Sequence, residues 1–242
     1  MKINTSEKIR NYFQSISSKE IKEKSFIENE LILTLGLNDE MLNEQPQELS
    51  DHFGKGFGLK IWQYPNQFAD YLHFISDYAN KINSYLEIGC RHGGTYIFTT
   101  EYLKKLNVNF NKSVSVDIVD LCPMLKEYLE FNSICEFKKV NSLSSEFRNY
   151  INDTFFDLVF IDGDHEYRGV RNDSELTKEK CNIQVYHDIV NDVCPGVVNR
   201  WREVKETYKD THNFYEFVDQ YESVNGSYLG IGVAVRKEWI SH

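Results

Sequence analysis

The stretch from Phe156 to His165, F-D-L-V-F-I-D-G-D-H, is an apolar run that ends in two carboxylates, a glycine and an imidazole. A continuous apolar run of this length is typical of a parallel strand that is buried on both faces of its sheet. Ligands of open α/β sheets bind at the carboxyl ends of such strands. We therefore expect Asp162, Asp164 and His165 to lie at a functional site.

Around this stretch, from residue 84 to residue 236, short apolar runs alternate with amphipathic segments of helical period. Strands are predicted over residues 84–88, 113–117, 135–140, 156–161, 183–186, 214–219 and 228–236. Helices are predicted over residues 95–106, 124–131, 145–152, 167–178 and 195–208. No crossover helix fits between the last two strands, so they must pair antiparallel. The pattern predicts an α/β fold with a Rossmann-like, doubly wound, mostly parallel seven-stranded sheet whose last strand is antiparallel.

The first part of the chain is polar and acidic and carries only short helical patches, for example over residues 19–35. We interpret residues 1–65 as an N-terminal helical extension, which serves as a lid or as the contact between copies in a homo-oligomer. Residues 66–242 are interpreted as the domain that carries the sheet. This domain opens with a helix whose apolar residues recur at helical spacing from Phe68 to Tyr78.

Charge and composition exclude several classes of function. The 242-residue chain has a formal net charge of −10, whereas a general nucleic-acid binder needs a basic face that neutralises phosphates. No apolar window reaches the ~18 residues of a membrane span, and the N-terminal segment lacks the apolar core of a signal peptide. The five cysteines are scattered without a C-x-x-C pair, which favours reduced thiols in the cytoplasm. We expect a cytoplasmic protein with no nucleic-acid or membrane partner.

The loop after the first predicted strand reads L-E-I-G-C-R-H-G-G over residues 86–94. The dinucleotide fingerprint G-x-G-x-x-G fails here because arginine occupies the place of its second glycine. The pattern E-x-G-x-x-x-G-G instead resembles the first motif of class I S-adenosylmethionine-dependent methyltransferases. That resemblance implies that S-adenosylmethionine binds along this loop, in contact with Glu87, Gly89, Arg91, Gly93 and Gly94.

The ends of the next strands fit the same cofactor. The resemblance implies that Asp117, at the end of the second strand, binds the ribose hydroxyls. A carboxylate is also by its own chemistry a bidentate acceptor suited to two adjacent hydroxyl donors. The resemblance further implies that Asn141 and Ser142, after the third strand, approach the adenine. Asp162, at the end of the fourth strand, completes the predicted cofactor contacts.

A second group of polar side chains indicates a divalent metal. The fifth predicted strand ends in V-Y-H-D at residues 185–188, so His187 and Asp188 should face the same cleft as Asp162. Carboxylate oxygens suit Mg²⁺, whereas an imidazole ligand favours Mn²⁺ or another transition metal. We predict a metal site formed by Asp162, His187 and Asp188.

The motifs D-G-D-H after the fourth strand, H-D after the fifth and P-G-V beyond it resemble the cephalosporin-hydroxylase and macrolide-sugar O-methyltransferase group. In metal-dependent members of that group, the first aspartate and an acidic pair bind Mg²⁺, and a histidine three residues beyond the first aspartate is the general base. Asp162, Asp188 and His165 match those positions, whereas His187 stands where an acidic residue is usual. The resemblance implies metal-assisted O-methylation of a sugar or nucleotide-sugar hydroxyl in surface-polysaccharide or related biosynthesis, with His165 as the base.

Two alternatives stay open at the level of sequence. One is a metal-independent methyltransferase for an oxygen or nitrogen of a small molecule, with His187 as an ordinary core residue. The other is a methyltransferase-like subunit that binds cofactor or a partner without catalysis. Asp164 also has a purely structural interpretation, because an aspartate ahead of a helix often caps its N-terminus.

Overall fold

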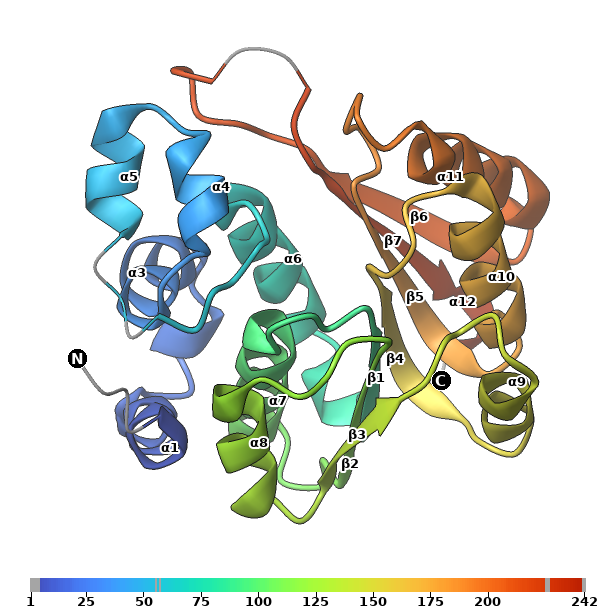
Figure 1. The fold of residues 1–242 in the computed structure, drawn as a ribbon, viewed down its shortest axis with the longest axis horizontal. Helices are drawn as coiled ribbons and strands as arrows, with labels where there is room; N and C mark the ends of the chain where they lie inside the picture. The colour runs from blue at the N-terminus through green and yellow to red at the C-terminus, as the bar shows by residue number, and fades with distance from the viewer. Residues whose placement is uncertain (1–4, 55, 57, 225–226, 241–242) are drawn as a thin grey trace.

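The apolar runs of the sequence form one seven-stranded sheet with the strand order β3-β2-β1-β4-β5-β7-β6 (Figure 1). The computed structural model describes residues 5–54, 56, 58–224 and 227–240. Its strands are β1 (Ser84–Ile88), β2 (Lys112–Asp117), β3 (Cys135–Lys139), β4 (Phe156–Ile161), β5 (Cys181–His187), β6 (His212–Phe217) and β7 (Ile231–Arg236). The first five strands run parallel, and β7 is antiparallel to both β5 and β6. The predicted fold class is confirmed.

Helices cover both faces of the sheet, because side chains of each central strand alternate between two apolar layers. In β4, Leu158 and Phe160 belong to one buried cluster, and Val159 and Ile161 belong to the other. The helices on the first face are α6 (Pro65–Ser76), α7 (Gly94–Leu106) and α8 (Pro123–Glu130), and those on the second face are α9 (Ser145–Asn152), α10 (Tyr167–Thr177) and α11 (Pro195–Tyr208) (Figure 1). Among the described residues, no helix combines the length and the apolar character needed to cross a membrane.

The N-terminal extension is helical and packs against the helices α6, α7 and α8, which cover the first face of the sheet. Its elements are α1 (Thr5–Ser15), η1 (Glu20–Lys22), α2 (Lys24–Phe26), η2 (Ile27–Leu31), α3 (Ile32–Leu35), α4 (Asp39–Asn43) and α5 (Gln47–Phe53). Phe13 of α1 meets Phe98 of α7 edge-on, with ring centroids 5.8 Å apart. The buried apolar side chains of the extension belong to the same cluster as those of α6 and α7. The boundary proposed between residues 65 and 66 falls at the start of α6.

The last part of the extension, from residue 58 to residue 64, leads into α6 and passes the start of α7. Ile61 forms a parallel bridge with Leu37. A Cβ on Gly94 would lie 2.2 Å from the carbonyl oxygen of Leu59, so this close approach requires glycine in the first turn of α7. The sequence of the glycine loop therefore also determines how closely the extension approaches the sheet.

The last strand differs from its predicted bounds. β7 begins at Ile231 rather than at residue 228, because Leu229 and Gly230 have left-handed φ angles of 54° and 92°, which interrupt the extended backbone. Gln67 donates from Nε2 to the carbonyl of Tyr228 over 3.0 Å and accepts the N–H of Gly230 over 2.9 Å. β6 lies two residues earlier than predicted, and β5 extends to His187. Two further short helices are η3 (Ala79–Lys81) and α12 (Lys237–Ile240).

Candidate active site

The carboxyl ends of β1, β2, β4 and β5 open into a cleft of about 800 Å³, within the usual size range of small-molecule sites. The cleft wall contains these predicted site residues: Glu87, Gly89, Arg91, Gly94, Asp117, Asn141, Ser142, Asp162, His165, His187 and Asp188. Gly93 is the exception. It is the N-cap residue of α7, with φ of 79°, and it lies next to Leu125 rather than on the cleft wall. The structure therefore brings the other predicted residues together at one edge of the sheet.

Gly89 lets the ends of β1 and β4 approach each other. Its φ is 91°, a left-handed conformation, and a Cβ at this position would lie 2.1 Å from the carbonyl oxygen of Asp162. The N–H of Asp162 in turn donates to the carbonyl of Ile88 over 2.8 Å. Because glycine meets both the conformational and the steric requirement, the glycine loop fixes the position of Asp162 in the cleft.

Asp117 is held by backbone amides at the end of β2. Its Oδ2 accepts the N–H of Arg91 over 2.6 Å, and its Oδ1 accepts the N–H of Val119 over 3.1 Å. Each carboxylate oxygen has a further lone pair, so the oriented carboxylate can still accept hydroxyl donors from the cleft. The guanidinium of Arg91 reaches toward the extension, where it lies 4.8 Å from the centre of the Trp62 ring and 3.4 Å from Glu40.

The loop after β3 lines one end of the cleft with polar and apolar groups. Asn141 accepts the N–H of Leu143 over 2.9 Å, and the carbonyl of Ser142 accepts from Asn172 over 2.9 Å. Ile118 and Leu143 line the same end and are 63% and 39% exposed. No sequence motif singled out these two side chains, although each is an apolar residue in a loop shortly after a strand end. Together they offer an apolar surface suited to a planar ring.

Glu87 lies on β1 in the floor of the cleft and is buried. It accepts the hydroxyl of Tyr85, and burial raises the pKa of the Glu87 carboxyl to about 8. The side chain is therefore mainly a neutral acid near neutral pH. A neutral acid can donate as well as accept a hydrogen bond, so Glu87 can serve either kind of partner.

The ends of β4 and β5 bring two carboxylates and two imidazoles together. Nδ1 of His187 lies 3.2 Å from Oδ1 of Asp162 and 3.3 Å from Oδ2 of Asp188. Nε2 of His165 lies 3.4 Å from Oδ2 of Asp188 and 3.7 Å from Oδ1 of Asp162. The predicted catalytic and metal-binding residues thus form one cluster. Within it His187 is buried, whereas the His165 side chain is 47% exposed.

The charges of this cluster reinforce one another. Burial would lower the pKa of His187, but attraction to Asp162 and Asp188 raises it well above the ordinary value. Burial would raise the pKa of Asp188, but the attraction of His187 lowers it. The interaction with Asp162 raises the pKa of His165 despite partial burial. The two carboxylates therefore favour the protonated form of His187 when no cation lies between them.

Two amide side chains that the sequence analysis did not identify hold these carboxylates. Gln63 donates from Nε2 to Oδ2 of Asp162 over 3.0 Å, and it accepts the hydroxyl of Thr95. Asn191 donates from Nδ2 to Oδ1 of Asp188 over 2.7 Å. The short spacing from Asp188 is a signal that could have identified Asn191. Gln63 belongs to the extension, and no local pattern indicates its contact.

Asp164 supports the start of α10 without being its N-cap residue. The N-cap residue is Glu166, and no side-chain bond caps the helix there. Oδ1 of Asp164 accepts the N–H of Glu166 over 3.0 Å, in the turn that precedes the helix. The helix therefore begins later than a cap at Asp164 would place it.

Residues 86–188 match the family model of a methyltransferase domain. The matched segment runs from β1 to the end of β5 and contains the glycine loop, Asp117 and the cluster around Asp162 and Asp188. Residues 86–188 therefore form a methyltransferase domain on this Rossmann-like sheet. This result confirms the resemblance on which the cofactor prediction was based. No curated protein matches the sequence of this methyltransferase significantly.

The fold of the methyltransferase is shared by solved structures at low sequence identity. An O-methyltransferase from Bacillus cereus in complex with SAH aligns with a TM-score of 0.56 and 15% identity, over 88% of this chain and 96% of that chain. A provisionally assigned O-methyltransferase from Klebsiella pneumoniae aligns with a TM-score of 0.52 and 16% identity, over 87% and 96%. A provisionally assigned caffeoyl-CoA O-methyltransferase from Staphylococcus aureus aligns with a TM-score of 0.51 and 13% identity, over 94% and 98%. At these identities the likeness establishes the fold.

One wall of the methyltransferase cleft comes from outside the matched segment. Glu44, Lys60 and Trp62 of the extension line it, together with Tyr228 from the connection between β6 and β7. The hydroxyl of Tyr228 donates to Oε2 of Glu44 over 2.7 Å and joins the two segments. The indole Nε1 of Trp62 is buried without a hydrogen-bond partner among the described residues. This wall, here called the acceptor wall, therefore offers aromatic and polar groups beside the acid and imidazole cluster.

Proposed function

We propose that this methyltransferase transfers the methyl group of S-adenosylmethionine to a hydroxyl oxygen of a small polar acceptor, a sugar or nucleotide sugar. The observation that carries the proposal is the position of His165, whose side chain is 47% exposed and whose Nε2 lies 3.4 Å from Oδ2 of Asp188. An imidazole that is both accessible and backed by a carboxylate is suited to take a proton from an acceptor. His165 is therefore our candidate for the general base.

In this proposal the cofactor lies across the ends of β1, β2 and β3. The oriented carboxylate of Asp117 accepts the ribose hydroxyls. The adenine lies beside Asn141 and Ser142, against the apolar side chains of Ile118 and Leu143. The methionine portion follows the glycine loop toward β4. Its positively charged sulfonium then faces the carboxylates at the ends of β4 and β5, which favour a cation.

The reaction is an in-line displacement at the methyl carbon. The acceptor oxygen forms a bond to that carbon while the carbon–sulfur bond breaks and its electron pair returns to sulfur. His165 takes the hydroxyl proton, and Asp188 stabilises the resulting imidazolium. Alignment of the reactants supplies roughly 7–11 kcal/mol of barrier reduction. A positioned base contributes about 10²–10⁴-fold in rate.

A divalent metal fits the same cluster. Asp162, His187 and Asp188 offer ligand atoms within 4.8 Å of one another, and a ring nitrogen of His187 faces both carboxylates. Two carboxylates and one imidazole favour Mn²⁺ or another transition ion over Mg²⁺. When bound, such an ion supplies a Lewis acid that lowers the pKa of the acceptor hydroxyl. His165 then remains free to receive the proton.

The acceptor wall supports a polar acceptor with an apolar side. The buried Nε1 of Trp62 has no partner among the described residues, and an acceptor hydroxyl would satisfy it. Trp62 and Tyr228 each combine an aromatic face with a polar atom, a combination that suits the two sides of a sugar ring. The sequence resemblance supports surface-polysaccharide or related biosynthesis as the setting.

Incubation with S-adenosylmethionine and a panel of sugars and nucleotide sugars, followed by mass analysis of the products, tests this function. The His165→Ala variant should lose about 10²–10⁴-fold in turnover, while calorimetry should find its affinity for S-adenosylmethionine close to that of the wild type. His212→Ala is the control, because His212 lies on β6 and does not line the cleft. Methylation of no member of the panel, or an equal loss of binding and turnover in His165→Ala, contradicts the proposal.

A further inference from the structure

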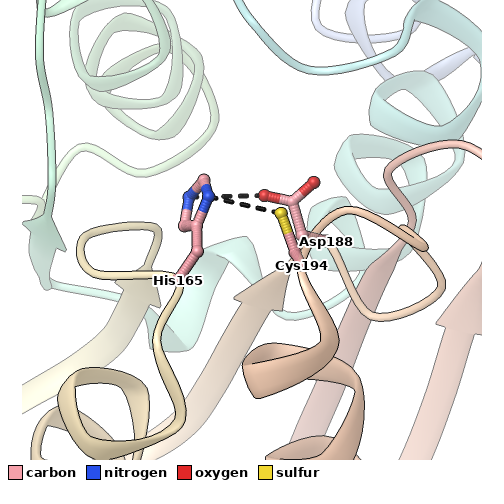
Figure 2. Close-up of side chains that lie close together, drawn as sticks. All are labelled: His165, Asp188 and Cys194. Carbon is pink, nitrogen blue, oxygen red and sulfur yellow. Dashed lines mark hydrogen bonds and ion pairs between the residues drawn. The ribbon is translucent and has the colours of Figure 1, made fainter.

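A cysteine joins the cluster beside His165 and Asp188, as Figure 2 shows. Sγ of Cys194 lies 3.3 Å from Nδ1 of His165, and Nε2 of the same ring lies 3.4 Å from Oδ2 of Asp188. One ligand atom from each of the three residues lies within 4.8 Å of the others. Sulfur, nitrogen and oxygen donors therefore converge at the cleft wall.

Three separate elements hold these donors. His165 follows β4, Asp188 follows β5, and Cys194 is the N-cap residue of α11, directly before Pro195. Cys194 and Asp188 are only 5% and 2% exposed, whereas the His165 side chain is half exposed. All three line the cleft, so an ion can reach the buried sulfur and oxygen from the side of the imidazole.

We propose that His165, Asp188 and Cys194 form a site for a thiophilic divalent cation such as Zn²⁺. Zinc is bound in proteins by thiolate, imidazole and carboxylate, and a site with three protein ligands keeps a fourth position open. A thiolate favours Zn²⁺, whereas Mg²⁺ and Ca²⁺ prefer oxygen ligands. This donor set is chemically distinct from the group around His187, which lacks sulfur.

An ion bound at this site should prevent methyl transfer. This expectation rests on the proposed function, in which His165 is the general base. A neutral His165 that binds an ion through one ring nitrogen carries its hydrogen on the other nitrogen, so no lone pair remains to take the proton of the hydroxyl. Asp188 is common to both donor sets, so an ion held with Cys194 also removes a ligand from the site around Asp162 and His187. We therefore expect Zn²⁺ to inhibit turnover.

The thiol of Cys194 is protonated in the free protein, because burial raises its pKa to about 12 and the nearby carboxylates add to the increase. Zinc binds cysteine as the thiolate, so binding must release the thiol proton to solvent. The N-terminus of α11 favours the thiolate form, because the helix dipole is positive at that end.

Cobalt(II) tests the site directly, because a thiolate bound to Co²⁺ gives a charge-transfer absorption in the near ultraviolet. Wild-type protein should show this band on titration with Co²⁺, and Zn²⁺ should abolish it. Cys194→Ser should lose the band and bind Co²⁺ at least about tenfold more weakly. Cys122→Ser should keep the band. It is a matched control, since Cys122 is also an N-cap residue followed by proline and does not line the cleft.

Zinc titration in the turnover assay gives the second readout. The rate of each protein is expressed relative to its own rate without zinc. Wild type and Cys122→Ser should then be inhibited at the same zinc concentration. Cys194→Ser should need a zinc concentration at least about tenfold higher for the same inhibition. Absence of the cobalt band in wild type, an unchanged band in Cys194→Ser or equal loss in Cys122→Ser overturns the proposal. The wild-type result requires no variant to fold. A band that depends on Cys194 in a protein that methylates no acceptor leaves the metal site standing and rejects the proposed function alone.

Discussion

Gln63 donates from Nε2 to Oδ2 of Asp162 over 3.0 Å, across 99 positions of sequence. The same amide accepts the hydroxyl of Thr95 in the first turn of α7. The extension therefore helps to orient a carboxylate of the acid and imidazole cluster, in addition to packing against the helices that cover the sheet.

Replacement of Gln63 by alanine should reduce both activity and stability. Asp162 loses a partner that orients it, and effects of this kind are about 10–100-fold. The buried Thr95 hydroxyl loses its acceptor, so the free energy of unfolding should fall by about 1–3 kcal/mol. Steady-state rates and urea unfolding measure the two effects. Gln47→Ala, which removes only an exposed bond to Asp51, should leave both unchanged. Wild-type turnover in Gln63→Ala would show that the contact has no role in catalysis.

Asp117→Asn should weaken cofactor binding, because the amide replaces a charged acceptor of the ribose hydroxyls by a neutral one. Hydrogen bonds to charged groups contribute about 1.5–3 kcal/mol, which corresponds to roughly 10–150-fold in the dissociation constant. Calorimetry with S-adenosylmethionine and with its demethylated product measures the change. Asp120→Asn is the matched control, because Asp120 is an exposed carboxylate paired with Lys139. An equal effect of the two substitutions would argue for a general change of charge.

Removal of divalent metal should lower turnover if the donors around His187 bind an ion. We expect excess chelator to reduce the rate and Mn²⁺ to restore it better than Mg²⁺, since the donor set contains an imidazole. Rates with chelator and with each restored ion provide the measurement. Full activity in excess chelator would indicate that His165 acts without a metal.

The stability of the protein should fall as pH rises through the titration of Asp173. This residue of α10 is buried, its Oδ2 has no hydrogen-bond partner among the described residues, and burial raises its pKa to about 6 from 3.8. The folded state thus binds the proton more tightly than the unfolded state. The contribution of Asp173 to the free energy of unfolding is fully present below its pKa in the unfolded chain. It is lost as pH rises through its pKa in the folded protein, and the total loss is about 3 kcal/mol.

Asp173→Asn removes this titration and should therefore gain stability relative to wild type as pH rises. Between about pH 4 and pH 8 the difference in melting temperature should change by roughly 6–12 °C in favour of the variant. Thermal unfolding at the two pH values measures it. The exposed Asp153→Asn serves as the control and should show no such change. A difference that is the same at both pH values would contradict the assignment.

Local signals were sufficient to predict most of the sheet. The apolar run of β4 and the helices α9 and α11 have the predicted bounds, because strong signals flank them. Ser144 accepts the N–H of Phe147 and caps α9, and Pro195 occupies the first turn of α11. Since the carboxyl ends of parallel strands meet at one edge, the same predictions brought Asp162 and Asp188 into one cluster.

The acceptor wall and the partners of the cluster were not predictable in this way. Tyr228 and Glu44 lie 184 positions apart, and their hydrogen bond depends on how the extension packs rather than on any local period. The predicted start of β7 was wrong because Leu229 and Gly230 adopt a left-handed backbone there, and Gln67 of another element binds this turn. Cys194 was read only as one scattered thiol, since its nearness to His165 appears only in the folded chain.

The hydrogen bond between Tyr228 and Glu44 links two segments that lie on either side of residues 86–188, the segment that matches the methyltransferase family model. Exchange of these segments as a pair between related enzymes should change the choice of methyl acceptor. The affinity for S-adenosylmethionine should stay the same, because Asp117 and the glycine loop remain in place. Exchange of one segment alone would break this link. We therefore expect a new acceptor specificity to arise through coupled substitutions in these two segments, which are encoded far apart in the gene.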